Sequence, residues 1–152
     1  MRAAGRWLLR IAGVVYCLWM LWLLFGQRLG TQIYEQQLAD GINLVPFATV
    51  GKYIQLLTAC GDEALARHAA INLAGNVVLF IPLGIFLPSF CKNFRSFLKT
   101  ALAALGIIVA VEMLQYVTLL GSCDVDDLIL NMIGVLIGYP IWRMIRAGFD
   151  CQ

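Results

Sequence analysis

Four long apolar runs alternate with short polar stretches along the chain. The runs cover about residues 8 to 25, 69 to 90, 100 to 120 and 125 to 141. A run of about 20 apolar residues is long enough for an α-helix to cross the hydrocarbon core of a membrane. The pattern therefore predicts an all-α membrane protein with four transmembrane helices, which form a single domain over residues 1–152.

The first run has a second interpretation, as a cleaved signal peptide. It is long and rich in Trp, and Phe25-Gly-Gln-Arg-Leu-Gly30 follows it where a signal peptide would have a small-x-small cleavage site. A retained transmembrane helix is therefore the better interpretation.

The basic residues predict an orientation for the four helices. Eight of the eleven Lys and Arg residues lie at positions 2, 6, 10, 92, 95, 99, 143 and 146, in the two termini and the second loop. Seven of the nine acidic residues lie in the other two loops or at their helix ends. Because short cytoplasmic loops carry the excess of Lys and Arg, both termini are expected to be cytoplasmic.

In this orientation, the polar stretch after the first helix is the first extracellular loop. Its residues 52–59 have an amphipathic pattern, which predicts an interfacial segment lying on the membrane surface. The alternative is a plain surface loop with an interfacial anchor.

The fourth run carries the most distinctive polar pattern. Asp124, Asp127, Asn131, Gly134 and Gly138 follow one another at steps of three or four residues, so they share one face of a helix. That face is acidic at its start, polar one turn further on, and small beyond. A polar face of this kind in an apolar helix is expected to pack against other helices rather than against lipid.

The polar side chains within the helices gather on the extracellular side. At ~1.5 Å per residue, Asn76 lies roughly 12 Å below the outer end of its helix, Glu112 lies at about the same depth, and Asn131 lies roughly 6 Å below Asp127. The shallower polar side chains are His68, Asn72, Gln115 and the aspartates. We therefore predict one outward-facing polar pocket, floored by Glu112, Asn76 and Asn131 and rimmed by the aspartates.

Glu112 is the strongest single indication of a site. A carboxylate within a transmembrane helix costs about 3 kcal/mol, so Glu112 must face protein or water. In the functional interpretation it forms the floor of the pocket. In the structural alternative it is protonated and hydrogen-bonds an asparagine, which holds two helices together.

Asp124, Asp126 and Asp127 form an acidic cluster with two interpretations. Acids in the first turn of a helix cap its free N–H groups, but three exceed what capping requires. Carboxylates this close repel one another unless a cation or an arginine shares them. Arg67 is the candidate partner, and a divalent cation, Mg²⁺ or Ca²⁺, held by the three aspartates is the candidate cofactor.

The composition mainly excludes other classes of protein and site. The chain is 61% hydrophobic and 13% charged, as expected for a membrane protein. The five cysteines have no CxxC spacing, and Cys60 could pair with Cys123 only if both faced an oxidising side. The chain has no nucleotide-binding glycine motif, and we expect no nucleic-acid partner.

Four blocks of the sequence resemble the VanZ-like family, small bacterial membrane proteins named for a member associated with teicoplanin resistance. The blocks are Asn43-Leu-Val-Pro-Phe47, Asn72 with Asn76-Val-Val-Leu-Phe-Ile-Pro-Leu-Gly84, Glu112-Met-Leu-Gln115, and Asp124-Val-Asp-Asp-Leu-Ile-Leu-Asn131. The resemblance covers about residues 40–140. It implies a multi-pass protein of the bacterial cytoplasmic membrane, linked to the cell envelope and to glycopeptide tolerance. Many members have an arginine just before the Asp block, where this chain has Leu120-Gly-Ser-Cys123. Any role of a cation at that place therefore falls to Arg67 or a metal, or is absent.

These observations predict a non-enzymatic envelope protein whose pocket binds a lipid, a lipid-linked cell-wall precursor or a lipoglycopeptide. The predicted ligand-binding residues are Asn43, Arg67, Asn72, Asn76, Glu112, Gln115, Asp124, Asp126, Asp127 and Asn131. The alternative is a cation-dependent enzyme acting on an outer-leaflet lipid headgroup, with Glu112, Asp127 or His68 as the catalytic candidate. A transporter is disfavoured, because the inner half of the helices has almost no polar residue to continue a path.

Overall fold

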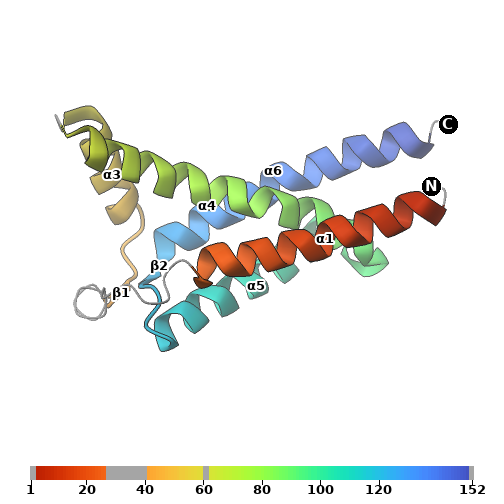
Figure 1. Ribbon diagram of the computed structural model, residues 1–152, viewed down its shortest axis with the longest axis horizontal. Coiled ribbons are helices and arrows are strands. Elements are labelled where there is room, and N and C mark those ends of the chain that lie inside the picture. The colour runs from red at the N-terminus through yellow and green to blue at the C-terminus, as the bar shows by residue number, and fades with distance from the viewer. Residues whose placement is uncertain (1–2, 27–40, 60–61, 151–152) are drawn as a thin grey trace.

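A computed structural model describes residues 3–26, 41–59 and 62–150. In chain order the described elements are α1 (Ala3–Leu24), β1 (Ile42–Asn43), α3 (Ala48–Ala59), α4 (Glu63–Phe90), the 3₁₀ helix η2 (Lys92–Arg95), α5 (Phe97–Val117), β2 (Cys123–Asp124) and α6 (Val125–Asp150). The long helices run side by side as a bundle, and α3 is a short helix at one end of it (Figure 1).

Four of these helices, α1, α4, α5 and α6, are long and apolar enough to span a membrane, which confirms the predicted fold class. Two helices extend further than hydropathy alone predicts. Helix α4 begins at Glu63 rather than near Ala69, because the carboxylate of Asp62 accepts the backbone N–H groups of Ala64 and Leu65 and starts the helix earlier. Helix α6 continues to Asp150.

The closest packing in the bundle joins α4 to α6. Gly134 and Gly138 on α6 leave room for the carbonyl oxygens of Val77 and Ile81 on α4, and a Cβ atom at either glycine would overlap that oxygen. Gly84 does the same on α4, where a Cβ would overlap the carbonyl oxygen of Val135. Small residues let helix backbones approach this closely in a membrane, where burial of apolar surface supplies no driving force. The glycine face of α6 therefore faces α4.

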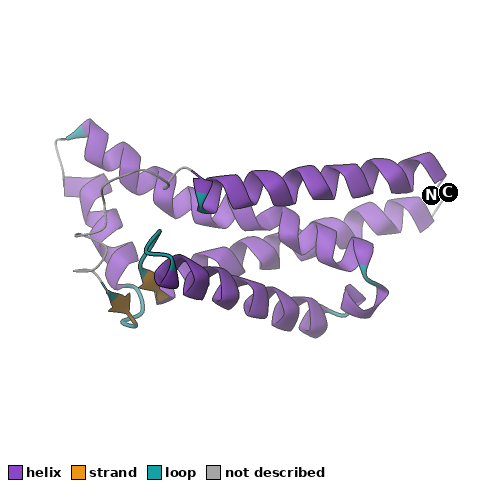
Figure 2. Ribbon diagram, turned by 60° about the horizontal axis from the view of Figure 1, so that its bottom comes forward, coloured by secondary structure: helices purple, strands orange, loops and turns teal. Residues whose placement is uncertain are grey.

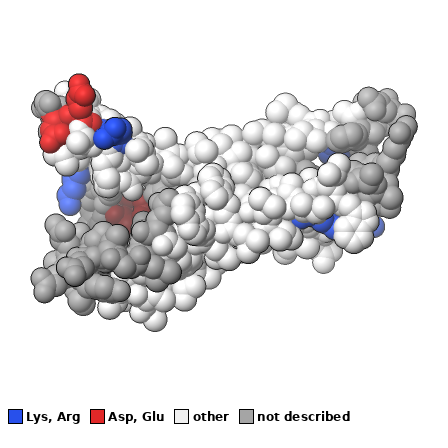
Figure 3. All heavy atoms as spheres, viewed as in Figure 1, with Lys and Arg blue, Asp and Glu red and all other residues white. Residues whose placement is uncertain are grey.

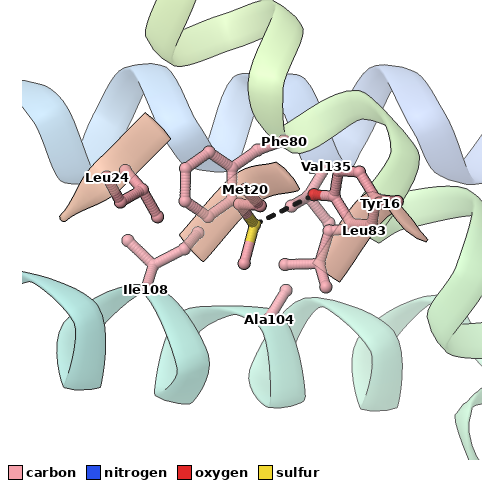
Figure 4. Packing of buried hydrophobic residues seen from close by; sticks show 8 residues of the cluster. All are labelled: Tyr16, Met20, Leu24, Phe80, Leu83, Ala104, Ile108 and Val135. Carbon is pink, nitrogen blue, oxygen red and sulfur yellow. Dashed lines mark hydrogen bonds between the residues drawn. The ribbon is translucent and has the colours of Figure 1, made fainter. Parts of the chain in front are cut away.

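A compact apolar core lies between all four spanning helices (Figure 4). Its side chains are Tyr16, Met20 and Leu24 of α1, Phe80 and Leu83 of α4, Ala104 and Ile108 of α5, and Val135 of α6. The Tyr16 hydroxyl lies 2.9 Å from the carbonyl oxygen of Leu79, to which it donates. Helix α1 is thus an integral part of the bundle, and its outer face, with Trp7, Leu8 and Trp19 exposed, is left to lipid.

The two ends of the bundle differ in charge. The N-terminal end of α1 and the C-terminal end of α6 lie together, with η2 nearby, whereas α3 lies at the opposite end (Figure 1). On the face seen in Figure 3, the acidic side chains of the described residues lie at the α3 end. The positive-inside rule predicts that the α3 end is extracellular, and we call it the extracellular end.

At the extracellular end, two segments distant in sequence pair as a short parallel ladder (Figure 2). Ile42 pairs with Cys123, and Asn43 pairs with Asp124. This ladder places the loop before α3 directly beside the start of α6. The predicted interfacial segment is helical, as α3, and begins at Ala48 rather than at residue 52.

Candidate functional site

The acidic cluster separates into three side chains with three different sets of partners. Asp124 is the residue before α6, and its carboxylate accepts the N–H of Asp126 at 2.9 Å. It also accepts the Thr49 hydroxyl at 2.5 Å and the side-chain amide of Asn43 at 3.3 Å. Asp124 therefore caps its own helix and at the same time binds β1 and the first turn of α3.

Asp126 caps a helix other than its own. It is fully buried, and its carboxylate accepts three backbone N–H groups at the start of α3: Phe47 at 2.5 Å, Thr49 at 2.8 Å and Val50 at 3.0 Å. Phe47, which precedes α3, has a φ of 64° and no side-chain oxygen with which to cap the helix. The start of α3 therefore depends on a carboxylate supplied by α6.

Asp127 points toward α4. The side-chain amide of Asn76 donates to Asp127 Oδ1 at 2.5 Å, across the α4–α6 interface. This contact lies on the same face of α6 as Gly134 and Gly138, as the spacing of these residues predicts. Asn76 belongs to a membrane-spanning helix, whereas the side-chain partners of Asp124 lie in β1 and α3.

Glu112 and Asn131 meet beneath the aspartates, between α5 and α6. Both side chains are buried, and Asn131 Nδ2 lies 3.5 Å from Glu112 Oε1. The amide oxygen of Asn131 is buried without a hydrogen-bond partner among the described residues. Gln115, one turn from Glu112, instead donates to the carbonyl oxygen of Leu24 at 3.0 Å and closes the end of α1.

A polar cavity of about 480 Å³ opens above these residues at the extracellular end. We call it the outer pocket. Four predicted site residues line it: Asn43, Asn72, Asp124 and Asp127. Sequence reasoning missed four further polar residues, Thr49, Lys52, Tyr53 and Ser122. Asn76, Glu112 and Asn131 are not among its lining residues, so the pocket is shallower than predicted and the Glu112–Asn131 pair lies below it.

Arg67 and His68 lie apart from the acidic cluster. Both side chains are exposed on the first turns of α4. His68 contacts the amide of Asn72 at 3.2 Å, and within the described ranges no ion pair joins Arg67 to an aspartate. The sequence suggested an arginine as the partner of the aspartates. Their partners are instead Asn76, Asn43, Thr49 and backbone N–H groups.

The predicted divalent-cation ligands do not converge. Asp124 and Asp126 accept the hydroxyl and the backbone N–H of Thr49, Asp127 accepts the amide of Asn76, and the described part of the chain contains no group of three His, Cys, Asp or Glu side chains that could hold a metal ion. Donors from β1, α3 and α4 thus occupy oxygens of all three carboxylates.

One thiol at this end has an altered acidity. Burial, and then the negative charges of Glu112 and Asp124, raise the pKa of the Cys123 thiol. Cys123 is a free cysteine, and Cys60, its suggested disulfide partner, lies outside the described residues.

Four spanning helices with a polar extracellular end define a multi-pass membrane protein. The family model described as VanZ/LLP1 matches residues 11–146. The chain belongs to this family. It is similar to Protein VanZ of Enterococcus faecium, with 24% identity over 146 residues that cover 92% of this chain and 76% of that protein. No solved structure matches the chain.

Proposed function

We propose that this chain is a VanZ-like protein of the bacterial cytoplasmic membrane that contributes to teicoplanin tolerance. It would do so by binding an outer-leaflet lipid or a lipid-linked cell-wall precursor in the outer pocket. Family membership supports the link to glycopeptides. The observation that carries the binding proposal is the convergence of polar side chains from β1, α3, α4 and α6 on one extracellular cavity.

The chemistry of the outer pocket suits a ligand rich in hydroxyl and amide groups. Asn43, Thr49 and Asn72 supply neutral donors and acceptors, Lys52 supplies a positive charge, and Asp127 supplies a carboxylate. Sugars and peptides carry groups that pair with each of these, and a headgroup with a single charged atom would use few of them.

The surroundings of the outer pocket suit a ligand that also carries an apolar chain. The loop between β1 and α3 exposes three large apolar side chains next to the pocket: Leu44 at 70%, Val45 at 64% and Phe47 at 63%. An apolar patch beside a polar cavity at the membrane surface can hold the two parts of an amphiphile at once. A lipid-linked precursor and a lipoglycopeptide both have this composition.

The test compares two aspartates at the same end of the molecule. In a teicoplanin-sensitive host, expression of the full chain should raise the minimum inhibitory concentration of teicoplanin. Asp127→Asn removes one pocket charge while keeping the side-chain shape, and it should return the value toward that of cells without the protein. Asp62→Asn, which alters an exposed cap of α4 outside the pocket, should retain the tolerance.

Equal amounts of each variant in the membrane are required, measured by quantitative blotting. If Asp127→Asn cells tolerate teicoplanin as well as cells with the unchanged protein, the outer pocket does not carry the function. If the unchanged protein itself leaves sensitivity unaltered, the link to glycopeptides is wrong for this chain.

A further inference from the structure

A second cavity lies at the cytoplasmic end and shares no lining residue with the outer pocket. It is a groove of about 770 Å³ between the first half of α1, the end of α4 and η2. We call it the inner groove. Three cations line it, Arg10, Lys92 and Arg95, and no acidic residue does.

The cations and the apolar residues of the inner groove lie at different depths along the membrane normal. Arg10, Lys92 and Arg95 lie near the cytoplasmic ends of α1 and α4. From Arg10 toward the membrane centre, α1 forms one wall of the groove over ~12 Å at 1.5 Å per residue. This wall consists of Gly13, Val14, Cys17 and Leu18. The groove is therefore positively charged at its mouth and apolar along its length.

Arg10 in particular is placed where an anion is favourable. It lies within the apolar stretch Trp7–Leu24, where a cation is costly unless it reaches the interface or a counter-charge. Its guanidinium lies 5.4 Å from the centre of the Trp7 ring, and the structure describes no ion pair for it. A phosphate bound by Arg10 together with Lys92 and Arg95 would supply that counter-charge.

We propose that the inner groove binds an anionic glycerophospholipid of the cytoplasmic leaflet. The phosphate would lie among Arg10, Lys92 and Arg95, and one acyl chain would lie along the apolar wall of α1. The charge complementarity and the order of charged and apolar residues along the membrane normal both match this amphiphile. Basic pockets between helices at the cytoplasmic side are where such headgroups bind.

The test measures lipid binding to the full chain by native mass spectrometry, with phosphatidylglycerol, phosphatidylcholine and inorganic phosphate as probes. The triple variant Arg10→Gln, Lys92→Gln, Arg95→Gln should weaken phosphatidylglycerol binding at least about tenfold, because each cation near the surface contributes to anionic-lipid affinity. The control triple Lys99→Gln, Arg143→Gln, Arg146→Gln removes the same charge from the same end but from residues outside the inner groove. It should change binding much less.

A second pair of variants keeps every charge and tests the apolar wall. Val14 lines the inner groove and Val15 does not, although both side chains are 59% exposed. Val14→Trp should fill the groove and weaken phosphatidylglycerol binding, whereas Val15→Trp should not.

Three results would overturn the proposal. Equal losses in the two triple variants would mean general attraction to a basic surface. Phosphatidylcholine binding as tight as that of phosphatidylglycerol would remove the role of charge. The third result has two parts: excess inorganic phosphate displaces phosphatidylglycerol, and Val14→Trp binds phosphatidylglycerol as tightly as Val15→Trp. Together they would identify a soluble-anion site instead.

Discussion

Replacement of Asp126 should release α3 from the rest of the molecule. In the folded protein this buried carboxylate accepts the N–H groups of Phe47, Thr49 and Val50. Asp126→Ala removes the acceptor and leaves all three donors at the start of α3 without it. Phe47, the residue before α3, has no side-chain oxygen with which to replace the lost cap.

The size of the effect follows from the three hydrogen bonds. A hydrogen bond to a charged group contributes about 1.5–3 kcal/mol, and an orphaned buried donor costs about 1–3 kcal/mol. The loop before α3 is partly exposed, so water would recover part of the loss. We expect α3 to be destabilised by about 3 kcal/mol, which corresponds to roughly a hundredfold larger population of the open form.

Hydrogen–deuterium exchange of the purified protein measures this opening directly. Peptides covering α3 should exchange roughly a hundredfold faster in Asp126→Ala, while the α4–α6 glycine interface keeps its protection. The matched control is Asp62→Ala, which removes an exposed cap of α4 that bonds only two N–H groups. Unchanged exchange in α3, or equal effects of the two substitutions on α3, would refute the capping of α3 by Asp126.

Three further predictions concern the helix interfaces and the extracellular thiol. Glu112→Gln should fold as stably as the unchanged protein in a thermal melt, because the new amide can donate to the Asn131 amide oxygen; a loss of more than about 1 kcal/mol would contradict this pairing. Gly138→Leu should abolish the peak of folded protein on size-exclusion chromatography, because its side chain meets α4 backbone, whereas Gly106→Leu, which meets nothing within 4 Å, should fold. For Cys123, the raised pKa lowers the thiolate fraction at a given pH, so maleimide alkylation should reach half its maximal rate at higher pH in the folded than in the denatured protein; identical profiles would contradict the burial of this thiol.

The transmembrane helices were predictable because hydropathy reports directly on the solvent around a helix. The same signal fails at the helix ends, where polar residues enter the helix. Asp62 starts α4 six residues before the apolar run, and Glu63 and Arg67 then lie within the helix. That this face of α6 packs against other helices was also predictable, because Asp127, Gly134 and Gly138 repeat at helical spacing; that the partner is α4 was not.

The outer pocket was only partly predictable. Asn43 and Asp124 are 81 residues apart and meet through a two-residue ladder, which is too short to leave a periodic pattern. The capping of α3 by Asp126 is likewise a tertiary contact, invisible in local sequence. One signal was present: Phe47 cannot cap α3, so an acceptor had to come from elsewhere, and the unexplained acids of the Asp cluster were the available source. Tyr53 and Thr49 belong to the pocket for the same tertiary reason.

Photo-crosslinking within living cells tests the binding role of the outer pocket most directly. A benzoylphenylalanine replacing Tyr53 lies in the outer pocket, whereas one replacing Ile54, which is exposed and outside the pocket, serves as the matched control. We predict an adduct at position 53, with the mass of a lipid or lipid-linked cell-wall precursor, that is absent at position 54 and lost in Asp127→Asn. Equal labelling at both positions, or no adduct at position 53, would contradict it.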